Sequence, residues 1–216
     1  MTTGPARTTL SRERVLRAAL DLVDREGADA LTMRRLGRAL GVEAMSLYGY
    51  VRSKDDLING VVELIFGEMP LVVPGPEPWQ ERVHRHADIY RSVLLAHPNA
   101  VRLVAGRPLV TERTAAFVES ALADLRSIGL DVETADRVLG VIAGFTLGLV
   151  SEQTGAGRRT TSPGDVLDLQ RFPHLADMAA LGAMTPDRYD AEFELGLDFI
   201  VGGIERLLAE ARTRRG

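Results

Sequence analysis

Four prolines fall within nine residues of this chain, in the stretch from Pro70 to Pro78. A proline inside a helix removes a backbone hydrogen bond and clashes with the preceding turn, so no helix can cross this stretch. Most of the remaining sequence has apolar residues at helical spacing. We therefore expect two groups of helices, with a domain boundary at residues 70–78.

Before the boundary, residues 11–69 are expected to form the first domain. Residues 1–10 are rich in Thr, Gly, Pro and Ala, which is typical of a flexible arm. Ser11, Thr32 and Ser53 are suited to cap helix N-termini, and Gly27 and Gly41 to end helices. The helices expected here cover 11–26, 33–40, 43–50 and a segment that begins at 54.

After the boundary, residues 79–211 predict a larger helical domain. Residues 154–164 are polar and rich in glycine, so we expect a flexible loop there. Strand-like sequence is confined to 71–73, and the predicted fold class is all-α. The helices expected in this domain cover 79–97, 100–105, 108–128, 131–153, 165–181 and 186–211.

The composition excludes several classes of protein. Of all residues, 45% are hydrophobic and 26% are charged, which argues against a disordered or fibrous chain. With no cysteine, disulfides, thiolate nucleophiles and Cys-based zinc sites are excluded. The N-terminus lacks the apolar segment of a signal peptide, and no window approaches roughly 18 uninterrupted apolar residues. We expect a cytoplasmic protein with no membrane partner.

The charge is uneven along the chain. The formal net charge is -4 at pH 7, yet residues 1–60 carry ten basic side chains against eight acidic ones. Such asymmetry is typical of a binding module beside a more acidic partner domain. It permits nucleic-acid binding by the first domain but does not specify it.

The stretch from Leu31 to Val51 has the layout of a helix–turn–helix. Its leucines and valines are spaced to pack two short helices against each other across a turn at Gly41. In such a motif, the first turn of the second helix meets base edges in the major groove of DNA. Taken alone, a helix–turn–helix can also be purely structural.

With its surroundings, this stretch resembles the TetR family of bacterial transcriptional regulators. The likeness is carried by RVLRAALDLVDREGADA and LTMRRLGRALGVEAMSLYGYVRSKDDLINGV. Beyond the boundary, PWQERVHRHADIYRSVLLAHPNAVRLVAGRP, GFTLGLVSEQ and FELGLDFIVGGIERLL are similar to the C-terminal domain of the tetracycline repressors. The resemblance covers about residues 10–211 and is weakest at 154–185. It implies a three-helix DNA-binding domain joined to a larger helical domain for ligand binding and dimerisation.

The resemblance implies a homodimer that binds a palindromic operator in double-stranded DNA and is released by a small-molecule effector. Arg34 matches a family position that reads guanine, and Lys54, the one lysine of the chain, stands at a helix N-terminus that suits phosphate. Ala44 and Met45 offer contacts to thymine methyl groups. The expected DNA-binding residues are Thr32, Arg34, Ala44, Met45, Ser46, Tyr48, Tyr50 and Lys54.

Two of these residues have alternative interpretations. If Tyr48 does not contact DNA, it is a buried structural tyrosine. If Met45 does not contact DNA, it packs against the first helix. Arg35 and Arg38 are expected to be solvated charges on a helix face rather than readers of bases.

A glycine stripe marks the expected dimer interface. Gly140, Gly144 and Gly148 lie four residues apart, which lets another helix approach closely. The alternative is tight packing within one chain. The final helix has a wide apolar face, and the resemblance implies that both helices pair with their copies. The expected interface residues are Gly140, Gly144, Gly148, Leu197, Ile200, Val201 and Ile204.

The resemblance also places an effector pocket in the second domain. The magnesium-ligating His of the tetracycline repressors aligns with Leu103, and a Thr three residues on aligns with Gly106. These side chains offer no ligand for Mg²⁺. We therefore expect no metal, no cofactor and a largely apolar effector rather than Mg-tetracycline. The matching pocket positions are His86, Tyr90, Leu103, Gly106, Glu119, Phe145 and Glu152.

Further signals for metal binding or catalysis are missing from the sequence. His84 and His86 are two residues apart on a helix and face different ways, so they do not form a metal pair. His97, directly before Pro98, is expected at the surface or at a helix end. No G-x-S-x-G, Walker, H-E-x-x-H or Rossmann motif occurs. We expect a regulator and no enzyme; the alternatives are an all-helical small-molecule-binding enzyme or a transcriptional activator.

Overall fold

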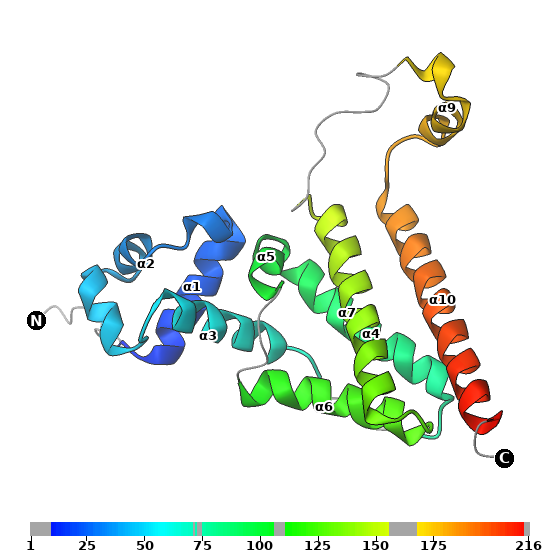
Figure 1. Ribbon diagram of the computed structural model, residues 1–216. Helices are drawn as coiled ribbons and strands as arrows, with labels where there is room; N and C mark the ends of the chain where they lie inside the picture. The colour runs from blue at the N-terminus through cyan, green and yellow to red at the C-terminus, as the bar shows by residue number, and fades with distance from the viewer. Residues whose placement is uncertain (1–9, 71, 73–74, 106–110, 156–167, 214–216) are drawn as a thin grey trace, which may run out of the picture. The chain divides into compact units, whose positions relative to one another are not determined.

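The computed structural model describes residues 10–70, 72, 75–105, 111–155 and 168–213 (Figure 1). Every regular element in these ranges is a helix and none is a strand, which confirms the all-α class. The chain forms two compact units. Unit 1 combines Met1–Leu71 with Ala96–Val118, and unit 2 combines Val72–Leu95 with Glu119–Gly216.

Unit 1 contains the N-terminal helices and a short later segment of the chain. Leu36, Leu47 and Leu57 have no exposed surface and form part of its core. Helix α6, Glu112–Ser127, begins in this unit and continues into unit 2. The other elements are α1 Arg12–Glu26, η1 Ala28–Ala30, α2 Met33–Leu40, η2 Ala44–Gly49, α3 Lys54–Phe66, η3 Pro98–Ala100 and α5 Val101–Val104.

The predicted helix ends of unit 1 are confirmed. Ser11, Thr32 and Ser53 each accept a hydrogen bond from the backbone N–H three residues on, which satisfies a donor that the helix leaves free. Gly41 ends α2 in the left-handed conformation, with φ 69° and ψ 31°.

The element after Gly41 is a 3₁₀ helix, η2, rather than the ordinary helix expected at 43–50. Its hydrogen bonds join residues three apart, as from Ser46 N–H to the Glu43 carbonyl at 3.0 Å. Close packing accounts for this compact form, because a Cβ at Gly37 on α2 would lie 2.8 Å from the Val42 carbonyl. Glycine at position 37 thus lets the turn approach α2.

Unit 2 is built on two long antiparallel helices that run side by side, α7 Val132–Gln153 and α10 Pro186–Thr213 (Figure 1). Helix α4, Trp79–Ala96, and the second part of α6 supply the rest of the core. Phe193 and Leu197 of α10 are completely buried in it.

The helix expected at 165–181 is wrong over its described part. A 3₁₀ turn at Leu169–Arg171 comes first, and α9 starts at Pro173 and ends at Ala180. Phe172 has φ -135° and ψ 72°, because the residue before a proline is driven out of the helical region. Of the expected flexible arm and loop, residues 1–9 and 156–164 lie outside the described residues.

Candidate nucleic-acid interface and ligand-binding unit

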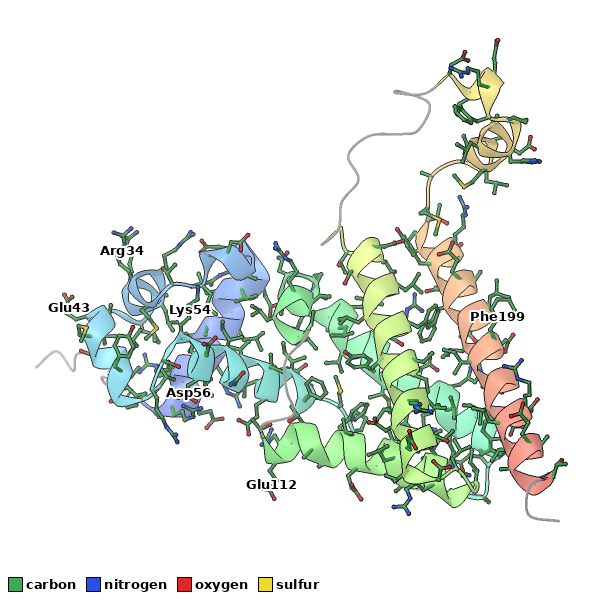
Figure 2. All side chains as sticks on the ribbon, in the orientation of Figure 1. Arg34, Glu43, Lys54, Asp56, Glu112 and Phe199 are labelled. Carbon is green, nitrogen blue, oxygen red and sulfur yellow. The ribbon has the colours of Figure 1, made fainter. Side chains whose placement is uncertain are left out.

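The predicted DNA-binding residues lie on α2, on η2 and at the ends of the elements beside them. Arg34 and Glu43 point outward from α2 and from the start of η2 in Figure 2. Exposed members of the predicted set are Thr32, Arg34, Met45, Ser46, Tyr48 and Lys54, whereas Ala44 and Tyr50 are half-buried.

Exposure decides between the alternatives for two of these residues. Met45 is 75% exposed and Tyr48 is 46% exposed. A buried structural tyrosine and a methionine packed on α1 are therefore both excluded. An exposed methionine and tyrosine on one short element give apolar and hydrogen-bonding contacts to whatever approaches this face.

The two neighbouring arginines of α2 differ in their partners. Arg35 forms an ion pair with Glu26 at the end of α1. Arg34 is exposed, and within the described part of the chain its side chain has neither a hydrogen bond nor an ion pair. Its guanidinium is therefore available for bidentate hydrogen bonding to a base edge.

Asp56 fixes the turn that joins η2 to α3, a role that sequence reasoning missed. Its carboxylate accepts two hydrogen bonds from Arg12 of α1, at 3.0 and 2.9 Å, and one from the Arg52 backbone N–H at 2.8 Å. Arg12 also donates to the Tyr50 carbonyl at 3.0 Å. The hydrogen bond from Arg12 lowers the pKa of the Asp56 carboxyl. These bonds position Tyr50 and, at the start of α3, Lys54.

The predicted pocket residues are divided between the two units. Leu103 lies on α5 in unit 1, and Gly106 lies outside the described residues. The others belong to unit 2: His86 and Tyr90 on α4, Glu119 on α6, and Phe145 and Glu152 on α7.

Burial separates the unit 2 positions further. Glu119 and Glu152 are exposed, whereas His86 and Tyr90 are buried. Burial raises the pKa of Tyr90 to about 12, so its hydroxyl stays neutral at physiological pH. Phe145 stacks on Phe193 of α10 at 6.0 Å between ring centroids. Phe145 therefore takes part in packing α7 against α10.

His86 belongs to a buried polar cluster that sequence reasoning also missed. Its Nε2 lies 2.8 Å from Oδ2 of Asp124 on α6, and Arg82 donates to the other oxygen of Asp124 at 3.1 Å. Burial lowers the pKa of His86, and the hydrogen bond to Asp124 only partly offsets this. Since an ionised carboxylate only accepts, a neutral His86 donates its Nε2–H to Asp124. The cluster joins α4 to α6.

Thr146 of α7 is a further polar residue in the interior of unit 2. Its side chain has no exposed surface, and its hydroxyl has no hydrogen-bond partner among the described residues. A buried hydroxyl without a partner is costly, so such groups usually meet a water or a ligand. Over the same ranges, no three His, Asp or Glu side chains gather to hold a metal ion.

The glycine stripe of α7 lies on the surface of the chain. Gly140, Gly144 and Gly148 are exposed, and a Cβ added at any of them would meet no atom within 4 Å. Packing within one chain is therefore excluded among the described residues. By length and composition α7 is the one described helix that suits a membrane span, which is weak evidence because apolar helices of soluble proteins match equally.

Two of the residues expected at the dimer interface are core residues instead. Leu197 and Ile204 are 0% and 1% exposed within the single chain, so they have no surface for a partner. Ile200 and Val201 are half-buried beside the same core. The large exposed apolar side chains of α7 and α10 are Val132, Val141, Leu195 and Phe199, and Phe199 projects away from α10 in Figure 2.

Known families match nearly the whole chain. Residues 15–61 match the family "Bacterial regulatory proteins, tetR family", and residues 73–208 match "Tetracyclin repressor-like, C-terminal domain". The class A tetracycline repressor from transposon 1721 of Escherichia coli is 33% identical over 215 residues, which cover 97% of each chain. An HTH-type transcriptional regulator of Saccharopolyspora erythraea is 29% identical, over 90% of this chain and 84% of that protein.

Solved structures agree with these sequence matches. Apo ActR from Streptomyces coelicolor superimposes with a TM-score of 0.80 at 28% identity, covering 97% of this chain and all of that one. ActR in complex with actinorhodin gives a TM-score of 0.80 at 28% identity, over 93% of this chain and 99% of that one. ActR therefore contains counterparts of both units in a single chain.

Proposed function

Because the chain belongs to the TetR family of DNA-binding transcriptional regulators, we propose that it is a repressor controlled by a small molecule. It binds a palindromic operator as a homodimer, and an effector in unit 2 releases it. The observation that carries this proposal is the outward face of α2 and η2. There Arg34, Met45 and Tyr48 are exposed on a helix–turn–helix that matches the family.

Each member of this face has a chemical role in the proposal. Arg34 reads a guanine, while Ala44 and Met45 contact thymine methyl groups. The remaining polar residues contact phosphates of the DNA backbone, and these contacts fix the register of the protein on DNA. These are Thr32, Ser46, Tyr48, Tyr50 and Lys54.

The surface of unit 2 supports the homodimer. The glycine stripe of α7 leaves open space for a second helix, and Val141, Leu195 and Phe199 add exposed apolar area on α7 and α10. Large apolar side chains that are exposed in the single chain favour a protein partner. A second copy would place the two helix–turn–helix motifs of the dimer about 34–36 Å apart, which is one turn of DNA.

The polar residues inside unit 2 support an effector that is largely apolar. Tyr90 and Thr146 are buried residues of this unit that carry hydroxyl groups. Leu103 and Gly106 replace the metal-binding residues expected in tetracycline repressors, so the chain does not fit a Mg²⁺ ion at these positions. ActR is a relative whose structure contains actinorhodin, and we propose an organic effector for this chain too. We also propose that the protein acts in the cytoplasm, without a membrane partner and without catalysis.

Fluorescence anisotropy tests the DNA-binding proposal. A labelled duplex from the region that flanks the protein's own gene is titrated at two salt concentrations, with random DNA as competitor. We expect tight binding that resists the competitor and saturates at two protomers per site. Equal and weak binding to both DNAs would contradict the proposal.

The same complex tests the effector class. Mg-tetracycline should leave the complex intact at concentrations that release the class A tetracycline repressor from its own operator. Aromatic, largely apolar compounds form the screening set, and release by one of them at constant salt identifies an effector. Release by Mg-tetracycline would contradict the proposal that the effector is not Mg-tetracycline.

A further inference from the structure

His97 lies between two carboxylates that belong to two different elements of unit 1. Its Nδ1 is 2.9 Å from Oδ2 of Asp24, in the last turn of α1. Its Nε2 is 3.1 Å from Oε2 of Glu68, two residues beyond the end of α3. His97 lies at a helix end, directly before η3, as one of the two expectations had it, and its side chain is only 13% exposed. We call these three residues the His97 tie.

The His97 tie is complete only when the imidazole carries a proton on both nitrogens. An ionised carboxylate accepts hydrogen bonds but cannot donate one, and a neutral imidazole has a single N–H. Neutral His97 can therefore donate to Asp24 or to Glu68, but not to both. In addition, Oδ1 of Asp24 is buried and has no hydrogen-bond partner among the described residues. A carboxylate oxygen that is shielded from water and has no partner favours a cation beside it.

Among the described residues, the charges that shift the pKa of His97 are those of Asp24 and Glu68. The 3₁₀ helix that follows it, η3, has no ionisable side chain, and Asn99 donates to the Asp24 carbonyl at 2.7 Å. Arg102 of α5 is directed to Asp29 instead, at 3.6 Å. Burial alone would lower the pKa of His97, but the hydrogen bonds and charges of Glu68 and Asp24 outweigh burial and raise it.

The direction of the pH dependence follows from this shift. A group whose pKa is raised by folding stabilises the folded form most at low pH, and the stabilisation is lost as the pH rises through the raised pKa. The His97 tie is therefore tight at pH 6 and weakens toward pH 8. This range includes the pH of most cells.

The position of the tie in the chain connects it to regulation. His97 is the first residue after α4, the helix that carries the pocket candidates His86 and Tyr90. Asp24 lies on α1 and Glu68 just beyond α3, and α1 packs against both α3 and α2, the first helix of the helix–turn–helix. When the His97 tie is formed, α1 and α3 are already held in place in the free protein. DNA binding then costs less conformational entropy.

We propose that His97 is a positioning residue whose protonation fastens α1 and α3 to the chain directly after α4, so that the operator is bound more tightly at pH 6 than at pH 8. The proposal rests on the proposed function, because it concerns the affinity of that same DNA-binding face. The proton is taken from water, and no covalent step is involved.

Operator binding at two pH values tests the proposal. Anisotropy titrations of the full-length protein use the duplex that flanks its gene and a random duplex, at pH 6 and pH 8 and at constant ionic strength. We expect the affinity for the flanking duplex, relative to random DNA, to fall by roughly three- to tenfold at pH 8, since a fraction of one proton per protomer is linked to the tie. His97→Gln should bind equally at both pH values, with an affinity near that of the wild type at pH 8.

His174→Gln is the matched control, because His174 is exposed on α9 and far from the tie in sequence. It should keep the wild-type pH dependence. If His97→Gln keeps that dependence as well, the proposal is overturned. A preference for the flanking duplex that is equal at both pH values overturns this inference alone. If no preference exists at either pH, the proposed function fails, and the inference fails with it.

An NMR titration of the imidazole signals gives a second readout that does not depend on DNA. The chain has four histidines, and the His97 signals are those lost in His97→Gln. We expect the pKa of His97 to lie above 6.5 in the wild type and to fall in Glu68→Gln. A pKa at or below 6.5 that Glu68→Gln leaves unchanged would overturn the tie, even if both variants are well folded.

Discussion

Arg34 and Arg35 are neighbours on α2, yet their side chains differ in whether they have a partner. Arg35 is held by Glu26, whereas Arg34 has no partner in the described part of the chain. We expect Arg34→Ala to weaken operator binding by about 1–3 kcal/mol and to relax the preference at one base pair. Competition with operators substituted one base pair at a time measures both effects.

Arg38→Ala is the control for this prediction, because Arg38 is exposed on the same short helix. It should leave the base preference unchanged, and any loss of affinity should be equal for all sequences. An Arg34→Ala variant with wild-type preference at every base pair would remove Arg34 from the reading face.

Asp56 is a residue whose importance depends on pH. Its pKa is lowered in the folded protein, chiefly by the hydrogen bond from Arg12. A lowered pKa gives stability that is present above the ordinary value of 3.8 and lost as the pH falls through the folded value. We expect Asp56→Asn to lower the free energy of unfolding by about 1 kcal/mol at pH 7, because the pair is partly exposed.

Urea unfolding at a series of pH values measures this prediction. The difference between the wild type and Asp56→Asn should shrink as the pH falls below 3.8. Asp21→Asn on the exposed side of α1 is the control and should differ little from the wild type at every pH. A constant difference for Asp56→Asn over the whole series would show that the ionised carboxylate is not the source of the stability.

At the scale of elements, local signals predicted helix ends well and long-range contacts poorly. Ser11, Thr32 and Ser53 cap helices because a cap depends only on the next three residues. The 3₁₀ form of η2 was missed because it depends on close packing against Gly37. The pairing of His86 with Asp124, 38 residues away, leaves no periodic signal in the sequence.

The buried pair between α4 and α6 gives the prediction at this scale. Asp124 is 4% exposed and holds both Arg82 and His86. Removing its charge leaves the Arg82 guanidinium buried beside a neutral group. We expect Asp124→Asn to lower the free energy of unfolding by about 3 kcal/mol or more, measured by urea denaturation at pH 7.

Glu119→Gln provides the comparison on the same helix. Glu119 is exposed, so its replacement should change the free energy of unfolding by less than about 0.5 kcal/mol. Equal effects of the two substitutions would mean that the cluster of Arg82, His86 and Asp124 does not hold α4 to α6.

At the scale of the whole molecule, the sequence predicted the all-α class and the apolar character of the last helix, but not which face of that helix is outward. Apolar residues occur around much of α10, so periodicity alone could not separate Leu197 and Ile204, which are buried in the chain, from Leu195 and Phe199, which are exposed. Leu197 and Ile204 belong to the core of the single chain. Leu195 and Phe199 stay exposed in the single chain.

The exposed apolar face of α7 and α10 predicts how assembly and DNA binding depend on each other. Phe199 is 73% exposed, so Phe199→Glu should leave the single chain folded while it places a charge in the proposed interface. We expect a monomer by sedimentation equilibrium at concentrations where the wild type is a dimer, with unchanged helical circular dichroism. Operator affinity should fall by at least about 100-fold, because one reading head alone contacts one half-site.

Phe199→Tyr keeps the aromatic ring and should remain a dimer that binds the operator. The two variants together separate assembly from folding, since both replace the same exposed residue and only Phe199→Glu removes the ring and adds a charge. A Phe199→Glu protein that stays dimeric would place the interface elsewhere on unit 2. One that is monomeric yet binds the operator with full affinity would instead remove the homodimer from the mechanism of DNA recognition, because two linked heads could then no longer account for the affinity.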